Sequence, residues 1–152
     1  MKRALFVLVS VVLTISVLCS CRVEYTDSYE PVCKFLQSYG MEAKVYYSLA
    51  KEAEEHYLDE GISKQLFTNT ELLPQNYTVA MSARLDYVFE IGVFVVPSRS
   101  DVQFLRELCR ERLQLLGSLS AGEGEILLSG NLLIYIFDRS PKDAVDVLKR
   151  VL

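Results

Sequence analysis

The chain has 152 residues, with 16 Lys and Arg, 20 Asp and Glu and one His, so its formal net charge is −4. A nucleic-acid-binding protein would carry a basic stripe, and this acidic composition argues against that class, so we expect no nucleic-acid partner. The length suits one domain with its own hydrophobic core.

The N-terminus has the pattern of an export signal. Lys2 and Arg3 precede an apolar run over residues 4–18, and a positive start followed by an apolar segment is typical of a secretory signal peptide. The sequence Leu18-Cys19-Ser20-Cys21 resembles the lipobox of bacterial lipoproteins, which implies cleavage after residue 20 and a diacylglycerol, with palmitate among its acyl chains, on the Cys21 thiol. An uncleaved anchor and ordinary cleaved secretion are the alternatives.

Lipid attachment would place the protein at the extracytoplasmic face of the cell membrane. Two acyl chains anchor a protein stably, whereas one binds only marginally. Loss of Lys2 and Arg3 with the signal changes the formal charge from −4 to −6, so the domain has little electrostatic attraction to anionic lipid. The membrane partner is therefore expected to be reached through the lipid anchor.

After the signal, residues 21–29 are predicted to form a tether. A helix is expected from Pro31 to Tyr39, ended by Gly40, because glycine is common just after a helix. Apolar residues at helical spacing predict a second helix over residues 42–59, with charged residues on its other face.

Alternating apolar residues predict a strand over 77–83. The next segment, 87–97, is apolar on both faces, which indicates a central strand. A helix follows from a Ser100 capping box to Leu116. A hairpin with a Gly-Asn turn at 130–131 comes next, then a last helix starting with Ser140-Pro141.

This order predicts an α+β fold. N-terminal helices precede a β-β-α-β-β-α unit, and a four-stranded, mainly antiparallel sheet with helices on one face fits it. The expected organisation is a signal peptide over 1–20, a tether over 21–29 and a single domain over 30–152.

The segment from Tyr77 to the C-terminus resembles a family of small bacterial envelope lipoproteins, mostly Gram-positive, that share a C-terminal domain of unknown function. The resemblance is carried by Glu-Ile-Gly-Val-Phe at 90–94, the Arg-bearing helix around 106–112 and Ser-Gly-Asn at 129–131 leading into 132–137. It implies an envelope location and a compact domain, and it implies no activity.

Glu90 is the sharpest candidate site residue, because it lies within the most apolar predicted strand. A buried carboxylate must take up a proton, find a cation or face solvent. Arg112 flanks the apolar stripe of the following helix and is a candidate partner, and Arg84, Arg106 and Arg110 are the others. Glu90 with Arg112 is either a structural ion pair or a ligand anchor.

His56 and Glu52 would share a face of the predicted 42–59 helix and form an alternative, carboxylate-rich ligand or metal site. One histidine is a weak signal, so no metal and no cofactor is expected. Cys33 and Cys109 fit either a disulfide, which an extracytoplasmic location allows, or two separate buried thiols.

The sequence contains no nucleophile elbow, P-loop or dinucleotide-binding glycine motif, so we expect a protein that is not an enzyme. A non-enzymatic interaction module with an envelope protein partner is the leading interpretation. The tyrosines near the start of the mature chain would suit an interface or ordinary packing; they are Tyr25, Tyr29, Tyr46, Tyr47 and Tyr57.

Overall fold

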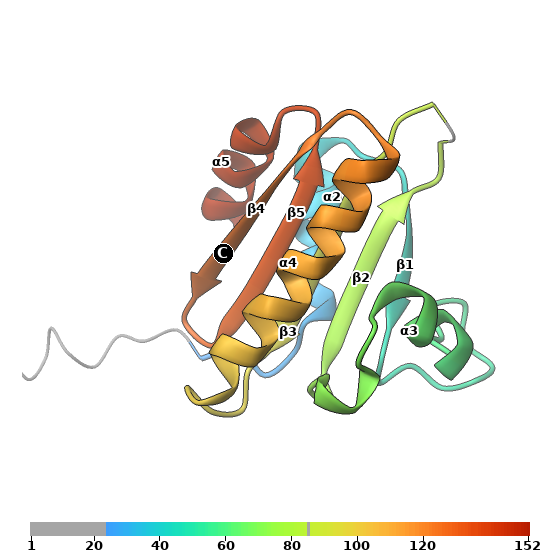
Figure 1. Cartoon of the computed structure of the whole chain (residues 1–152), viewed down its shortest axis with the longest axis vertical. Coiled ribbons are helices and arrows are strands. Elements are labelled where there is room, and N and C mark those ends of the chain that lie inside the picture. Colours follow the sequence, from blue (N-terminus) through green and yellow to red (C-terminus); the bar gives the residue numbers. More distant parts are fainter. Residues whose placement is uncertain (1–23, 85) are drawn as a thin grey trace, which may run out of the picture.

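A computed structural model describes residues 24–84 and 86–152 (Figure 1). The predicted signal peptide over 1–20 and Cys21 lie outside the described residues. In chain order the elements are α2 (Tyr29–Tyr39), β1 (Ala43–Tyr47), α3 (Glu60–Leu66), the 3-10 helix η1 (Thr70–Leu72), β2 (Tyr77–Ser82), β3 (Glu90–Val95), α4 (Asp101–Leu119), β4 (Glu123–Ser129), β5 (Leu132–Asp138) and α5 (Pro141–Val151).

The fold is α+β, as predicted, but its sheet has five strands instead of four. The strand order is β1-β2-β3-β5-β4, and every neighbouring pair is antiparallel. The predicted β-β-α-β-β-α unit corresponds to β2 through α5. In the five-stranded sheet, β3 is the middle strand, between β2 and β5, and β1 and β4 are the edge strands.

The additional strand, β1, replaces the helix predicted over 42–59, and that prediction was wrong. Val45 pairs with Ala80 of β2 in an antiparallel register, and turns follow up to the start of α3. The segment Lys44-Val45-Tyr46-Tyr47 is rich in residues that favour strands, and pairing with a formed neighbour decides such cases. Only α2 therefore precedes the sheet.

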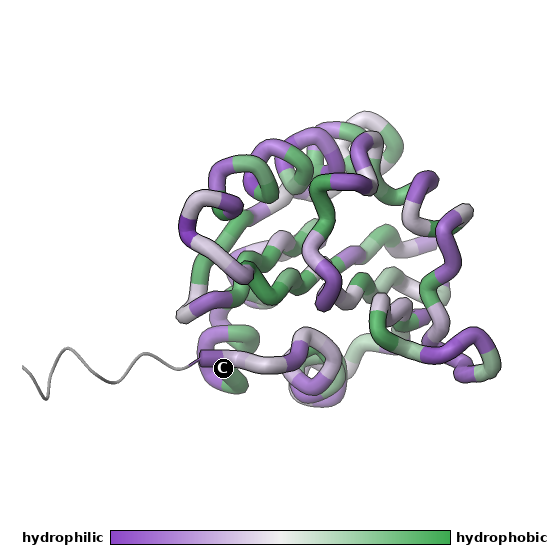
Figure 2. Tube along the Cα trace, turned by 90° about the horizontal axis from the view of Figure 1, so that it is seen from below, coloured by the Kyte–Doolittle hydropathy of each residue, from purple (hydrophilic) through white to green (hydrophobic). Residues whose placement is uncertain are grey.

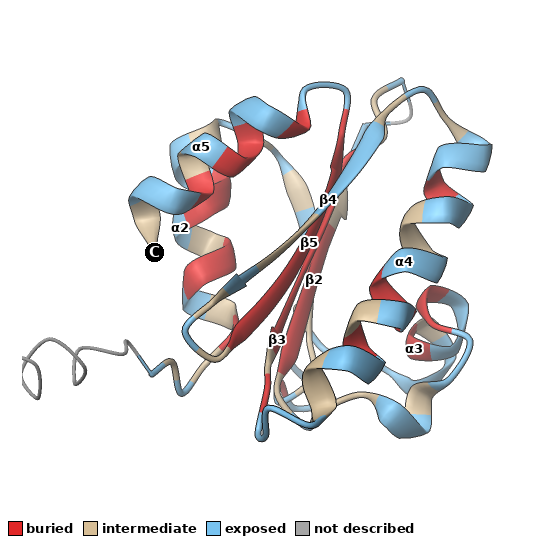
Figure 3. Ribbon diagram, turned by 60° about the vertical axis from the view of Figure 1, so that its left-hand side comes forward, coloured by how far each residue is buried: buried red, intermediate tan, exposed pale blue. Residues whose placement is uncertain are grey.

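Helices cover both faces of the sheet, which corrects the predicted single covered face. Figure 3 shows α2 and α5 on one side and α3 and α4 on the other. The reason is the composition of β3, where Ile91 and Val93 belong to one hydrophobic core while Phe94 belongs to the other. A strand that is apolar on both faces needs cover on both.

The hydropathy of the chain follows this layering. Figure 2 shows apolar segments along the strands and on the inner sides of the helices, with polar segments in the connections. Within residues 24–84 and 86–152, no helix is long and apolar enough to cross a membrane.

Several predicted boundaries are confirmed. Gly40 ends α2 with a φ of 71° and Gly130 has a φ of 59° in the β4–β5 turn, both left-handed values that suit glycine. Pro141 opens α5. Neither Ser100 nor Ser140 makes a side-chain capping hydrogen bond, so the side-chain caps predicted for α4 and α5 do not form.

The antiparallel register defines two ends of the sheet. Tyr47, Tyr77, Val95, Ser129 and Leu132 lie at one end, which we call the anchor end. At the opposite end, which we call the far end, the strands terminate at Ala43, Ser82, Glu90, Glu123 and Asp138.

Candidate functional site

Glu90 forms a buried ion pair with Arg112, and the structure thus brings together the two residues singled out from the sequence. Arg112 Nε donates to Glu90 Oε1 at 2.8 Å, and its Nη2 donates to Oε2 at 2.6 Å. The Tyr135 hydroxyl also donates to Oε1, at 2.6 Å. Only 3% of the Glu90 side chain and 11% of the Arg112 side chain are exposed.

Three elements position this group. Glu90 begins β3, Arg112 comes from α4, and Tyr135 comes from β5, where it lies directly opposite Gly92 of β3. A Cβ at position 92 would lie 2.1 Å from Tyr135 Cε1. The missing side chain of Gly92 therefore leaves room for the Tyr135 ring to lie across β3 and reach Glu90.

The surroundings of Arg112 and Tyr135 raise the pKa of both side chains. Burial alone lowers the pKa of Arg112, but hydrogen bonding to Glu90 and its negative charge outweigh burial, so the net pKa is raised. Burial and the neighbouring charge of Glu90 raise the pKa of Tyr135 well above its ordinary value. Tyr135 stays protonated and keeps donating to the carboxylate.

The Glu90–Arg112–Tyr135 group is closed to ligands. Both carboxylate oxygens accept hydrogen bonds from protein donors. None of the five principal grooves on the described surface is lined by a member of the group. Of the two roles that the sequence left open for Glu90, the geometry supports the structural ion pair.

The segment predicted as a tether is fixed on the domain from Tyr25 onward. Tyr25 N donates to Asn131 Oδ1 at 2.7 Å, Asn131 Nδ2 donates to the Tyr25 carbonyl at 2.7 Å, and the Tyr25 hydroxyl donates to the Leu152 carbonyl at 2.6 Å. Ser28 Oγ lies 2.7 Å from both Asn76 Oδ1 and Thr78 Oγ1. These contacts join the N-terminal segment to β2, to the β4–β5 turn and to the C-terminus.

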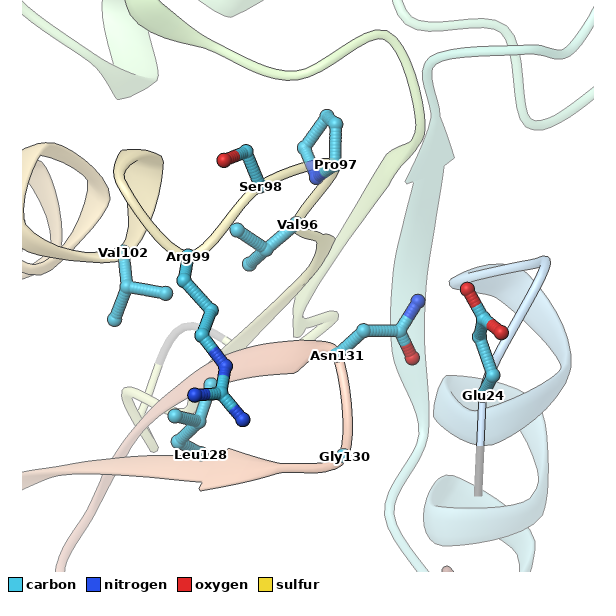
Figure 4. Close-up of a pocket in the computed structure, with 9 residues that line it drawn as sticks. All are labelled: Glu24, Val96, Pro97, Ser98, Arg99, Val102, Leu128, Gly130 and Asn131. Carbon is cyan, nitrogen blue, oxygen red and sulfur yellow. The ribbon is translucent and has the colours of Figure 1, made fainter. Parts of the chain in front are cut away.

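A groove of about 630 Å³ lies beside this segment at the anchor end. Its walls come from Glu24, the loop between β3 and α4, the start of α4 and the β4–β5 turn. Figure 4 shows the Arg99 side chain extending across it toward Leu128, while Asn131 points toward the side that carries Glu24. The lining residues are Glu24, Val96, Pro97, Ser98, Arg99, Val102, Leu128, Gly130 and Asn131.

A second polar cluster, centred on the buried Asp138, occupies the far end. Its carboxylate accepts from the hydroxyls of Tyr39 (2.8 Å) and Tyr87 and from the Ser140 amide (3.0 Å). Burial, followed by the hydrogen bond and charge of Asp138, raises the pKa of Tyr87 to about 12. Asp138 thus joins α2 and the β2–β3 connection to β5.

The alternative site at Glu52 and His56 has no helix to support it. Both residues lie in the connection between β1 and α3. There the backbone carbonyl of His56 accepts a hydrogen bond from Tyr47 N at 2.8 Å, and the centre of the His56 ring lies 5.3 Å from the centre of the Tyr29 ring. In the described part of the chain, no group of three or more His, Cys, Asp or Glu side chains is arranged to hold a metal ion.

The disulfide between Cys33 and Cys109 is not formed, and both thiols are free. Cys33 is on α2 and Cys109 is on α4, and these two helices lie on opposite faces of the sheet, so the sheet separates the two thiols (Figure 3). Cys109 is buried in the core, and burial raises the pKa of its thiol to about 12. In this structure the two thiols are separate, and only Cys109 is buried, whereas Cys33 is half-buried.

The predicted interface tyrosines are mostly part of the packing. Tyr57 is 36% exposed, and Tyr25, Tyr29, Tyr46 and Tyr47 are half-buried. Sequence reasoning missed Tyr135, Asp138 and Asn131 as the residues that organise the polar contacts.

Tyr135 sits in an apolar run where its hydroxyl needs a partner, and that is the one signal that could have identified it.

Comparisons with protein-family models, curated proteins and solved structures found no match for this chain. The resemblance to small envelope lipoproteins therefore stays a prediction from the sequence.

Proposed function

We propose that this chain is a bacterial lipoprotein, anchored at the extracytoplasmic face of the cell membrane through Cys21, whose domain is a non-enzymatic interaction module for another envelope protein. The observation that carries the proposal is the sequence Leu18-Cys19-Ser20-Cys21 at the end of an apolar run. A cysteine directly after a small residue is the acceptor that lipid attachment requires.

The position of the domain relative to Cys21 supports the proposal. The two hydrophobic cores are built from residues between Val32 and Leu148, so cleavage after residue 20 removes none of these core residues. Among the described residues, Tyr25, four positions after Cys21, makes the first hydrogen bonds to the rest of the domain. A lipid on Cys21 would therefore lie beside a complete domain.

The surface of α4 supports the interaction role. Phe104 is 60% exposed and Leu119 is 72% exposed, and both are large apolar side chains on one helix. A protein partner that packed along α4 would remove both side chains from water, which is favourable for apolar groups. Glu90, which could have served as a ligand anchor, is already occupied by Arg112.

The test is a Cys21→Ala substitution in cells supplied with a labelled fatty acid. The proposal expects the wild-type protein to carry the label and to sediment with membranes, and the variant to carry none and to leave the membrane fraction. Undiminished labelling of the variant would refute Cys21 as the acceptor. Crosslinking in intact cells, followed by mass spectrometry, tests the partner, and a repeated failure to recover an envelope protein would count against the interaction role.

A further inference from the structure

The N-terminal segment restricts how an anchored domain can be oriented. Tyr25 is held at three points, by both ends of the Asn131 amide and by the Leu152 carbonyl. Thr26 accepts from Asn76 Nδ2 at 2.9 Å, and Asp27 accepts from the Tyr47 hydroxyl at 2.8 Å. All of these partners lie at the anchor end, so the chain enters the domain there and nowhere else.

The distance from Cys21 to this attachment is short. Tyr25 is four positions after Cys21, and a fully extended chain spans about 3.3–3.6 Å per residue, or about 14 Å in total. Strand β5 has seven residues, and at about 3.3 Å per residue the sheet is about 23 Å long. A lipid on Cys21 could not enter a bilayer on which the far end rested.

The two corners of the anchor end differ in charge. Near the β4 edge, Arg99 crosses the groove, which Glu24 also lines (Figure 4). Two further cations, Lys149 and Arg150, lie in the last turn of α5, and Leu152, which follows this helix, contacts Tyr25. Leu128, at the same corner, is 46% exposed. Near the β1 edge, the connection between β1 and α3 exposes several carboxylates: Glu52, Glu54, Glu55 and Asp59.

We infer that the β4 corner of the anchor end lies against the lipid headgroups, with the 97–99 loop and the Gly130 turn as its contact surface. This inference rests on the proposed lipid attachment at Cys21. In this orientation the guanidinium of Arg99 contacts the lipid phosphates, while its aliphatic stem and Leu128 lie at the boundary between the headgroups and the acyl chains. The acidic β1 corner is tilted away, and the far end, with the Asp138 cluster, faces outward.

The inference is tested by energy transfer from the protein to a dye on the headgroups of phosphatidylcholine vesicles. The donor is attached to single cysteines introduced as Ser98→Cys, Glu52→Cys or Glu42→Cys in the lipidated protein. Cys33 is replaced by Ala, and Cys109 is buried and does not compete. Transfer falls steeply with the distance between the donor and the layer of headgroup dyes, so the Ser98 position should transfer several-fold more efficiently than the Glu42 position, with Glu52 between them.

Three results separate the possible failures. Vesicle flotation reports the anchor by itself: if the protein does not float, the proposed lipid attachment fails and the orientation fails with it. If the protein floats but transfer from Glu42 or Glu52 equals or exceeds that from Ser98, the orientation alone is overturned. Inserting ten Gly and Ser residues between Val23 and Glu24 is the matched control, which should keep flotation and reduce the difference between the three positions.

Discussion

Replacing Glu90 with Gln should destabilise the domain severely. The substitution keeps the volume of the side chain but leaves the guanidinium of Arg112, whose side chain is 11% exposed, without its counter-ion. Removing one member of a buried ion pair costs about 3–5 kcal/mol. A domain of this size has a total stability of about 5–15 kcal/mol, so a loss of about 3–5 kcal/mol removes at least about a fifth of it.

Urea denaturation of an unlipidated chain lacking residues 1–21, followed by circular dichroism, measures this loss. The matched control is Glu107→Gln on α4, because Glu107 also pairs with an arginine, Arg110, but both side chains are 52% exposed. Exposed pairs contribute about 0–1 kcal/mol. The two substitutions remove the same charge from an Arg–Glu pair, so the difference between them reports burial.

A combined variant separates the cost of breaking the pair from the value of having it. Glu90→Leu with Arg112→Met and Tyr135→Phe removes every polar atom of the group together. Apolar replacement of a complete buried pair is often neutral or stabilising, so the triple variant should be more stable than Glu90→Gln. A loss below about 1 kcal/mol for Glu90→Gln, in the range of an exposed pair, would refute the reasoning.

Three further predictions concern other parts of the fold. Gly92→Ala should reduce the melting temperature, because the added Cβ would lie 2.1 Å from Tyr135 Cε1; an unchanged melting curve would contradict the close approach. A thiol reagent at pH 8 should modify half-buried Cys33 in the folded protein but reach Cys109 only after unfolding; equal rates at both would show that the core is open. Tyr87 has a folded pKa of about 12, raised by burial and Asp138, against about 10 when unfolded. The contribution of Tyr87 to stability is therefore complete below about pH 10 and is lost as the pH rises toward 12. The melting temperatures of the wild type and of Tyr87→Phe should converge over this pH range. A constant difference between the two melting temperatures would contradict the prediction.

The errors in the sequence-based prediction have identifiable physical causes. Tyr46, Ala50 and Tyr57 have helical spacing, yet the first of them lies in β1 and the other two in the connection that follows. Spacing within the segment could not reveal that β2 had an unpaired side for Val45 to occupy. Tertiary pairing overrides a local pattern of this kind.

The covered faces of the sheet were within reach of the sequence. The 87–97 segment is apolar on both faces, and that alone requires helices on both sides. The Glu90–Arg112 pair was predictable because a buried carboxylate needs a cation. The apolar run around Tyr135 indicates that its hydroxyl needs a partner, but it does not indicate Glu90 as that partner. The approach of the ring to Glu90 depends on the missing side chain of Gly92 on the neighbouring strand.

The docking of Tyr25 to Asn131 and Leu152 could not be predicted from the sequence either. These contacts join residues more than 100 positions apart, and a short polar segment after a signal peptide has no periodic pattern. Only the antiparallel register brings the β4–β5 turn and the C-terminus to the point where the chain enters.

The central proposal is lipid attachment at Cys21, and the most direct measurement is the mass of the N-terminal peptide of the protein isolated from bacterial membranes. The account predicts a peptide that begins at Cys21 and exceeds the mass of its amino acids by a diacylglycerol group. A peptide that begins elsewhere, or one that contains an unmodified Cys21, would contradict it.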